Sequence, residues 1–307
     1  MPASLDEVGR QRVLDMYRIV DTLPEVACND IVQLASILCD APIAVTSLID
    51  RDRQWFKASR GLDSSGSHRD NAFCARAIEA PNVLMEVPDA HADERFVANP
   101  FVTGTAGIRF YAGMPLVTEG GQAIGTVCVL DDEPRQLDAR QREGLQALAR
   151  LTMTLLDTRL REQELERAAV LAELRAGVRA TQFAVMILQV QGLAESAVRL
   201  GERSLERQLQ ELERQLADVV DVASGDNVNR TSQSAEYIVV LHGDAIAATE
   251  ARLRDRVEQF GVGTGITFAC ASAMSLDPKE RIEQGFLRAD EALTDVKDAL
   301  VVHVLDA

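Results

Sequence analysis

Arg109 and Tyr111 are the residues whose types and spacing best fit recognition of an anionic group. They lie two positions apart in the segment IRFYAG. An arginine guanidinium can donate two parallel hydrogen bonds to a carboxylate or a phosphate. The same guanidinium could instead pair inside the protein with Asp89 or Asp93 and fix a loop. The sequence leaves both interpretations open.

A small-molecule pocket needs apolar walls with a few polar groups placed among them. Residues of these types are spread over positions 55–113. Cys74 has two interpretations, because a thiol at the start of a helix has a lowered pKa and suits redox chemistry or covalent attachment, whereas a packed buried thiol is inert. The predicted pocket residues are Trp55, Phe73, Cys74, Asp89, Phe96, Arg109 and Tyr111, with Gly113 as a further candidate.

Strand-like and helical segments alternate over residues 1–135 and must position these side chains. Apolar residues at helical spacing predict a helix at 30–40, and a short helix is expected at 73–80. Two strands within 108–132 are joined by a turn in which Gly120–Gly121 supplies the positive φ of a tight hairpin. Further strands are expected at 42–50 and 82–87, with a charged turn and a second strand within 50–61 and a polar stretch at 62–71.

Residues 138–178 predict a single helix of about 40 residues, roughly 60 Å long at about 1.5 Å per residue. Such a helix is too long for one small domain to pack. Its apolar stripe and the charged run at 159–167 favour a coiled coil between two parallel chains. A single amphipathic helix lying across one protomer is the alternative. The stripe consists of Leu145, Leu148, Leu155, Leu156, Leu160, Leu165, Leu171 and Leu174.

The alternation of strands and helices over residues 180–307 predicts an α/β domain with helices covering the sheet. The polar run at 224–234 is expected to be a solvated hairpin loop, with a binding loop of new function as the alternative. Strands are expected at 183–190, 235–242, 265–272 and 300–305, and helices at 194–220, 244–259 and 279–299. The whole chain is therefore expected to be of the α/β (α+β) class, in three parts: 1–137, 138–178 and 179–307.

Composition limits the classes of function. The 307 residues are enough for two domains of about 150 residues each. A net charge of −16 argues against an extended nucleic-acid surface. No apolar run approaches the roughly 18–20 residues that span a bilayer, and the N-terminal segment lacks the apolar core of a signal peptide. The five cysteines are scattered, and His68 and His91 are isolated, so no metal or cofactor is predicted. We expect a reduced, cytoplasmic protein that binds neither nucleic acid nor membranes.

Five segments of the first half occur in a fixed order: PIAVTSLIDRDRQWFKASRGL, FCARAI, VPDAHADERFVANPFV, IRFYAGMPL and GQAIGTVCVLDDEPRQL. Together they are similar to the GAF domain family, over about residues 10–160. The resemblance implies a six-stranded antiparallel sheet with helices on one face and a small-molecule pocket on the other. It names no ligand.

The segment RADEALTDVKDA at 288–299 is similar to the closing helix of GGDEF domains, where an Ala-Asp-x-Ala-Leu-x-x-x-Lys pattern occurs. When the chain is aligned with the family from this helix, the first metal-binding Asp of the family corresponds to Gln189. The Asn that recognises guanine corresponds to Ala197. The signature Gly-Gly-Asp/Glu-Glu-Phe falls on Gln233, Ser234, Ala235, Glu236 and Tyr237.

The active groups of the GGDEF family are missing from this alignment. A diguanylate cyclase condenses two GTP molecules with Mg²⁺, which prefers carboxylate oxygens. Gln189 and Ala235 supply none, and side chains in place of the two glycines obstruct the close approach of the backbone to the nucleotide. The inhibitory Arg-x-x-Asp of the family keeps Asp226 but has Ala223 in the arginine position. The resemblance therefore implies a degenerate GGDEF domain, without cyclase activity or cyclic di-GMP binding at that site.

These inferences favour a non-catalytic cytoplasmic signalling protein. Its GAF module would sense an unidentified small molecule or a partner, and its inactive GGDEF domain would supply an interaction or dimerisation surface in a bacterial cyclic di-GMP pathway. A homodimer and a protein partner are expected, without a cofactor. Three alternatives remain: a cyclic-nucleotide receptor through Arg109, residual cyclase or GTP-binding activity, and a thiol redox enzyme using Cys74.

Overall fold

The chain folds into two compact units, Met1–Leu160 and Arg161–Ala307. The computed structural model describes residues 6–175, 182–231, 235–277 and 279–305. The boundary between the units falls inside one helix, α5 (Ala139–Arg175), which has 37 residues. The mixture of helices with antiparallel sheets confirms the predicted fold class. The three-part division of the chain stays a prediction.

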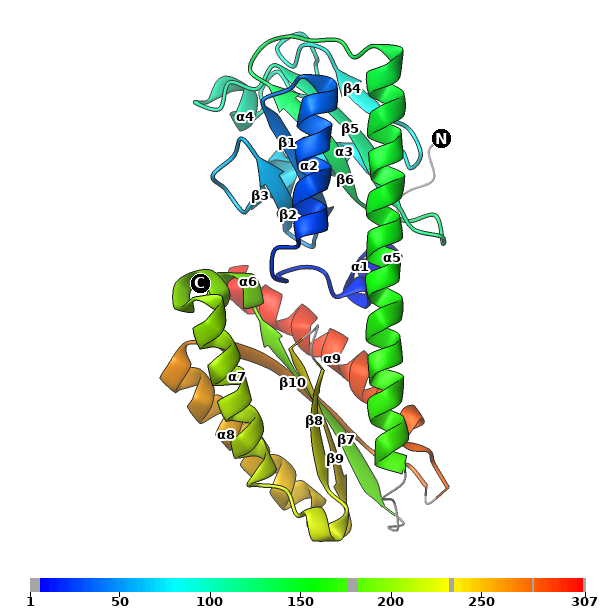
Figure 1. Ribbon diagram of the computed structural model, residues 1–307, viewed down its shortest axis with the longest axis vertical. Helices are drawn as coiled ribbons and strands as arrows, with labels where there is room; N and C mark the ends of the chain where they lie inside the picture. Colours follow the sequence, from blue (N-terminus) through cyan, green and yellow to red (C-terminus); the bar gives the residue numbers. More distant parts are fainter. Residues whose placement is uncertain (1–5, 176–181, 232–234, 278, 306–307) are drawn as a thin grey trace. The chain divides into compact units, whose positions relative to one another are not determined.

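The first unit contains a six-stranded sheet in the order β3-β2-β1-β6-β5-β4, and every neighbouring pair is antiparallel (Figure 1). This is the sheet that the GAF resemblance implies. The short edge strand β3 lies within 62–71, where only a polar stretch was expected. The strands are β1 (Ile43–Ile49), β2 (Arg53–Arg60), β3 (Gly66–His68), β4 (Met85–Val87), β5 (Phe110–Val117) and β6 (Ala123–Asp131).

The hairpin between β5 and β6 turns where the glycine pair predicted it. Gly121 has a φ of 85°, which suits a residue without a side chain. The turn is closed by a hydrogen bond from the amide of Gly121 to the carbonyl of Thr118, 2.9 Å long. This short connection sets the register that places Gly113 opposite Cys128.

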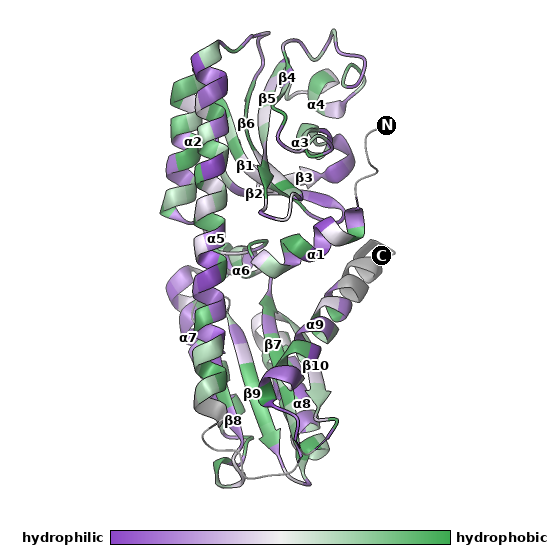
Figure 2. Cartoon of the chain, turned by 90° about the vertical axis from the view of Figure 1, so that its right-hand side faces the viewer, coloured by the Kyte–Doolittle hydropathy of each residue, from purple (hydrophilic) through white to green (hydrophobic). Residues whose placement is uncertain are grey.

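Alternating side chains of this sheet enter two separate cores. On one face, residues such as Leu48 and Leu116 pack with α2 (Val26–Cys39) and with Leu145 and Leu148 of α5. Green and purple segments both occur along α2 and α5, which overlap in the view of Figure 2, as expected of helices with one buried and one exposed side. The first helix, α1 (Glu7–Tyr17), contributes to the same core.

The opposite face of this sheet is also covered by helices, which corrects the expectation of helices on one face only. Short helices α3 (Phe73–Ala77) and α4 (Pro100–Thr103) pack there against Val45 and Tyr111. They can do so because the residues that the sequence assigned to a pocket are mostly apolar, and apolar side chains gain free energy by covering one another.

The second unit has a four-stranded sheet in the order β10-β7-β9-β8, with all neighbours antiparallel. Three of its strands lie where they were predicted. The fourth, β8, corrects the interpretation of 224–234 as a solvated loop. Its residues are largely polar because β8 is an edge strand, where polar side chains remain in water. The strands are β7 (Phe183–Gln191), β8 (Asn227–Thr231), β9 (Glu236–His242) and β10 (Thr267–Met274).

The prediction of a strand at 300–305 is wrong, because α9 (Ile282–Leu305) continues through these residues. Their valines favour strands, but β-propensity is a weak preference that context overrides. Extending an existing helix adds a hydrogen bond per residue without a new nucleation cost. The second sheet therefore gains its fourth strand from β8 and not from the end of the chain.

The helix expected at 194–220 is divided in two by Gly201, whose φ is 80°. Its parts are α6 (Leu193–Leu200) and α7 (Glu202–Ala217), and the next helix is α8 (Ile246–Thr264). Four leucines of α7 are buried at helical spacing, at positions 205, 209, 212 and 216. The hydroxyl of Tyr237 donates to the carbonyl of Leu209 at 2.7 Å and joins β9 to α7.

The long helix α5 starts and ends close to the predicted limits, with residues 176–178 outside the described part. Much of its apolar stripe is buried within the chain. This burial is what the alternative of an amphipathic helix packed within one protomer would give. In the first unit Leu145, Leu148 and Leu156 are buried, and in the second Leu171 is. Leu155 and Leu165 are exposed, and Leu160 packs partly against the first core. The side chain of Leu174 lies outside the described residues, and the coiled coil stays a prediction.

None of the described helices is both long and apolar enough to cross a membrane.

Candidate functional site

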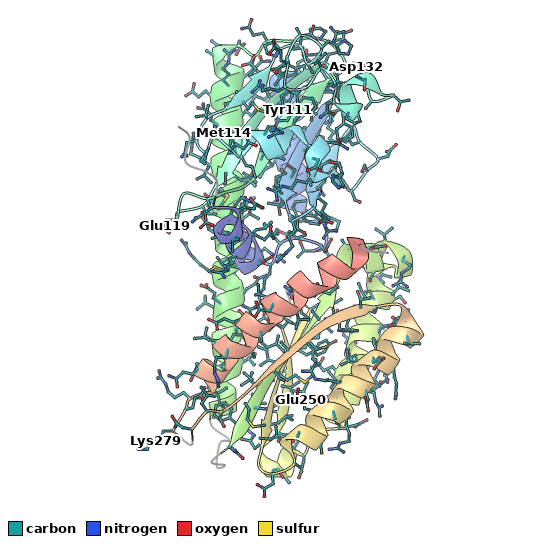
Figure 3. The ribbon with its side chains drawn as sticks, turned by 180° about the vertical axis from the view of Figure 1, so that it is seen from behind. Tyr111, Met114, Glu119, Asp132, Glu250 and Lys279 are labelled. Carbon is teal, nitrogen blue, oxygen red and sulfur yellow. The ribbon has the colours of Figure 1, made fainter. Side chains whose placement is uncertain are left out.

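Three of the predicted pocket residues form an aromatic stack inside the first unit. The ring of Phe73 on α3 lies 4.2 Å from that of Phe96 and 5.2 Å from that of Tyr111 on β5, and both pairs are nearly parallel. All three side chains are buried. Figure 3 labels Tyr111 in the interior of this unit. Trp55 lies apart from them, because its side chain belongs to the core on the other face of the sheet.

The thiol of Cys74 is the centre of a buried polar cluster beside this stack. Its sulfur accepts a hydrogen bond from Nε2 of Gln54 at 3.1 Å and one from the hydroxyl of Tyr111 at 3.4 Å. A second sulfur, that of Cys128, lies 3.6 Å away. We call Cys74, Cys128, Gln54, Tyr111, Ser47 and Thr126 the thiol cluster.

Ser47 and Thr126 complete the thiol cluster from neighbouring strands. They are opposite each other in the pairing of β1 with β6, and their hydroxyl oxygens are 3.2 Å apart. Thr126 and Cys128 are two residues apart on β6, so they face the same side of the sheet. The sequence prediction missed these residues and Gln54. The sequence did carry a signal for them, because they are polar residues within otherwise apolar strands. Polar side chains must find hydrogen-bond partners when they are buried.

Gly113 explains how Tyr111 reaches the thiol cluster. A Cβ atom at position 113 would collide with the ring and hydroxyl of Tyr111. The glycine therefore leaves space for the phenol to lie across β5 and for its hydroxyl to reach the sulfur of Cys74. Gly113 is thus a packing requirement of the site.

The thiol cluster shifts the pKa values of its two cysteines in opposite directions. Burial raises the pKa of Cys74, but hydrogen bonds from Cys128, Ser47, Thr126 and Tyr111 outweigh it and lower this pKa to about 6. The neighbouring Cys74 sulfur and burial raise the pKa of Cys128 well above its usual value. Cys74 lies at the start of α3, as predicted, but the groups that lower its pKa are side chains of the neighbouring strands. The arrangement can hold a thiolate next to a thiol, away from water.

Arg109 is engaged by Asp89, one of the two internal partners considered. Its Nε and Nη2 donate to the carboxylate of Asp89 at 2.8 and 2.7 Å. The carboxylate also accepts from the amide of His91 at 3.0 Å. The Arg109 guanidinium holds the pKa of Asp89 at about 2. The pair ties the segment after β4 to the start of β5, while Asp93 pairs with Arg95.

In the second unit, Glu236, which the sequence comparison aligned with the GGDEF signature, is part of a buried ion pair. Glu236 begins β9, and its side chain is fully buried. Arg167 of α5 donates to both of its oxygens, at 2.9 Å to Oε2 and 3.3 Å to Oε1 from Nη2, and at 3.0 Å to Oε2 from Nε. The Arg167 guanidinium also lies 5.7 Å from the ring centre of Phe286 on α9. Sequence reasoning missed Arg167, which lies about 70 residues before its partner in a helix interpreted as a linker.

The other signature positions supply no acid near Glu236. Gln189 is directly opposite Glu236 in the pairing of β7 with β9, and its Oε1 has no partner among the described residues. Ala235 has a φ of 47°, in the left-handed region that favours glycine. Ala197 lies buried in α6. Gln233 and Ser234 lie outside the described residues.

Asp226 has a structural role in the hairpin. One of its oxygens accepts from the amide of His242 at 2.7 Å, and the other from the amide of Asp221 at 3.1 Å. These bonds tie the start of β8 to the end of β9. The carboxylate thereby satisfies the backbone donor of His242, which would otherwise be buried without a partner.

Comparison with known families identifies the first unit. Residues 23–156 match the family model of the GAF domain, so this part of the chain is a GAF domain. Over 158 residues, the chain is 41% identical to a cyclic di-GMP phosphodiesterase of Pseudomonas aeruginosa. The match covers 51% of this chain but only 27% of the relative. The chain therefore spans about a quarter of the length of the curated relative that it matches.

Two solved structures are similar at low identity. The GAF domain of an Acinetobacter phosphoenolpyruvate-protein phosphotransferase has 14% identity and a TM-score of 0.38, covering 51% of this chain and 95% of that one. A microbial GGDEF domain, described with cyclic di-GMP, has 18% identity and a TM-score of 0.37, covering 45% and 87%. Likenesses at such TM-scores carry no argument about what this chain does.

The thiolate of Cys74 should titrate in the folded protein. We expect ultraviolet thiolate absorbance to appear as the pH rises through about 6 and to be absent from Cys74→Ser. Cys128→Ala removes a donor, and a lost hydrogen bond of about 1 kcal/mol should raise the midpoint by roughly 0.7 pH units. Cys39→Ser is the control, since burial raises the pKa of Cys39 to about 11. A wild-type protein without thiolate below pH 8 would contradict this expectation.

The pair Arg167–Glu236 should respond differently to single and double substitution. Arg167→Met leaves the buried carboxylate of Glu236 without its cation and should lower the free energy of unfolding by about 3–5 kcal/mol. Combining it with Glu236→Met should restore most of the loss, because both charges are then absent. Arg214→Met, in the exposed pair with Glu211, is the control and should cost less than about 1 kcal/mol. Urea unfolding measures all four proteins, and equal losses in the single and double variants would refute a buried ion pair.

Proposed function

We propose that this chain is a non-catalytic regulatory protein of a cyclic di-GMP pathway in the cytoplasm. Its GAF domain senses a small molecule or a protein, and its second unit is a degenerate GGDEF domain that serves as an interaction surface. The observation that carries this proposal is the ion pair between Arg167 and Glu236.

The ion pair opposes metal binding at the signature. A carboxylate that accepts from both Nε and Nη2 of a buried arginine must give up these bonds before it can bind Mg²⁺. That exchange would leave a largely buried guanidinium without its partner, which is strongly unfavourable. Gln189, the neighbour of Glu236 across the strands, brings a neutral amide. Phosphoryl transfer depends on electrostatic stabilisation, and these residues do not favour it.

The link to cyclic di-GMP comes from the curated relative. Its name states that it is a cyclic di-GMP phosphodiesterase, and 158 residues of this chain are 41% identical to it. The GAF domain indicates a sensory role in signalling. Because the match covers 27% of that relative, it supports a shared pathway and not a shared activity.

A homodimer is part of the proposal, and an exposed apolar surface of the GAF domain supports it. Helices α2 and α5 run side by side, since Leu38 lies against Gly144 at one end and Glu25 pairs with Arg159 at the other. Large apolar side chains point outward from both helices. Contiguous exposed patches of this kind mark interaction sites in proteins. They are Leu34, Ile37 and Leu38 on α2 and Leu151 and Leu155 on α5.

Nucleotide binding tests the catalytic part of the proposal. Thermal unfolding is measured with Mg²⁺ and GTP, cyclic di-GMP, cyclic AMP or cyclic GMP, and chromatography follows any product formed from GTP. A ligand at a hundredfold excess over its Kd stabilises by about 2.7 kcal/mol, which such a measurement detects. We expect no shift with GTP or cyclic di-GMP and no cyclic di-GMP formed.

A GTP-dependent shift that is lost in Glu236→Gln would contradict the proposal. A shift with a cyclic mononucleotide that is lost in Arg109→Ala but kept in Arg95→Ala would favour the alternative of a cyclic-nucleotide receptor. Arg95 is the matched control, because it pairs with Asp93 in the same segment.

Light scattering tests the dimer. The chain has a mass of 33.5 kDa, and we expect twice this mass for the wild-type protein. The double variant Leu34→Glu/Leu151→Glu places charges on the exposed surface and should give the mass of one chain. Val198→Glu is the control, because Val198 is 89% exposed on α6 and should leave the dimer intact. A wild-type protein with the mass of one chain would refute this part.

A further inference from the structure

The thiol cluster contains two cysteines that are far apart in the sequence and adjacent in space. Cys74 lies on α3 and Cys128 on β6, and their sulfurs are 3.6 Å apart. Both side chains are almost completely buried. We propose that Cys74 and Cys128 form a reversible disulfide when the protein meets a peroxide, so that the interior of the GAF domain is a site of oxidative modification. This inference holds whatever ligand or partner the GAF domain has.

The geometry requires only a small movement. A disulfide bond is about 2.05 Å long, so the sulfurs must approach by roughly 1.5 Å. Cys74 lies in a helix of five residues, and Cys128 lies on a central strand between β1 and β5. The short helix is therefore the part expected to move, while the strand stays in the sheet.

The neighbouring groups favour Cys74 as the attacking thiol. Gln54 and Tyr111 donate to its sulfur at 3.1 and 3.4 Å, which stabilises a negative charge there. Cys128 remains protonated beside it and can resolve the first product. The remaining cysteines are less suited, since burial raises the pKa of Cys28 and raises those of Cys39 and Cys270 to about 11.

Gln54 also lies between the thiol and the edge of the sheet. Its Nε2 donates to Cys74, and its Oε1 accepts from the hydroxyl of Ser67 at 3.4 Å. Ser67 belongs to β3, a three-residue edge strand. Short edge strands open more easily than central ones, so we expect a molecule as small as hydrogen peroxide to enter past Gln54.

The chemistry balances with the peroxide as the oxidant. The thiolate of Cys74 attacks one peroxide oxygen, forming an S–O bond while the O–O bond breaks, and the departing hydroxide takes up one proton and leaves as water. Cys74 is then a sulfenic acid. The sulfur of Cys128 loses its proton and attacks the sulfur of Cys74, and the S–O bond breaks to release a second water. Two thiols are oxidised by two electrons, and one peroxide is reduced to two waters.

Disulfide formation would change the packing of the aromatic stack. The sulfur of Cys74 would move toward Cys128 and away from Gln54 and Tyr111. Phe73 precedes Cys74 in the chain and stacks on both Phe96 and Tyr111. A local movement of α3 therefore reaches the residues that were expected to recognise a ligand.

Counting thiols in the full chain tests the proposal. The reduced protein is treated with hydrogen peroxide, unfolded, alkylated and weighed by mass spectrometry, and its peptides are mapped. The chain has five cysteines. We expect two of them to escape alkylation, one linked peptide pair joining Cys74 to Cys128, and full recovery of alkylation after reduction with a dithiol.

Variants separate the roles of the two sulfurs. Cys128→Ser should stop at a sulfenic acid on Cys74 that dimedone traps, and Cys74→Ser should keep its four thiols. Cys39→Ser is the control and should still form the Cys74–Cys128 link. Five alkylated cysteines in the wild-type protein, at peroxide concentrations that oxidise free glutathione completely, would overturn the proposal. A link between any other pair would overturn it as well, and the wild-type peptide map decides even if a variant fails to fold.

Discussion

The structure depends on the apolar side of one continuous helix. Within the first unit, α5 supplies Leu145, Leu148 and Leu156 to the core beneath the GAF sheet, and within the second it supplies Leu171 to the core of the other sheet. Arg167 lies on α5 four residues before Leu171, on the same side of the helix, and forms an ion pair with Glu236. A helix interpreted as a linker thus belongs to the interior of each unit. A displacement of either half of α5 would disturb the core on which that half packs, because close-packed interiors do not absorb displacements freely.

The two units keep polar groups inside for different reasons. In the GAF domain, hydroxyl, amide and thiol groups of the thiol cluster gather around Cys74, and Gly113 leaves room for Tyr111 to join them. Such a buried network fixes the packing around the sulfur, and the proposed disulfide would form within it. In the second unit, the guanidinium of Arg167 neutralises the buried carboxylate of Glu236. That pair suits a scaffold that maintains its fold without binding a metal.

The sequence predicted elements with strong periodicity or turn chemistry and failed where context decides. The strands of the GAF sheet other than β3, and the Gly120–Gly121 turn, follow from local patterns. The polar edge strand β8 and the helical end of α9 do not, because sheet edges and helix propagation override residue preference. The site was predicted in part: Phe73, Cys74, Phe96 and Tyr111 meet, while Trp55 faces the other core. Cys128 and Arg167 were missed, since contacts between residues so distant in sequence leave no local signal.

Metal binding tests the central claim most directly, that the signature acid serves structure and not catalysis. Mn²⁺ is added to the full-length protein at physiological ionic strength, and the signal of free Mn²⁺ is followed by electron paramagnetic resonance. The ion pair predicts no stoichiometric binding and the same titration for wild type and Glu236→Gln. Withdrawal of one Mn²⁺ per chain by the wild type, lost in Glu236→Gln, would show that Glu236 leaves Arg167 to bind metal and would contradict the account.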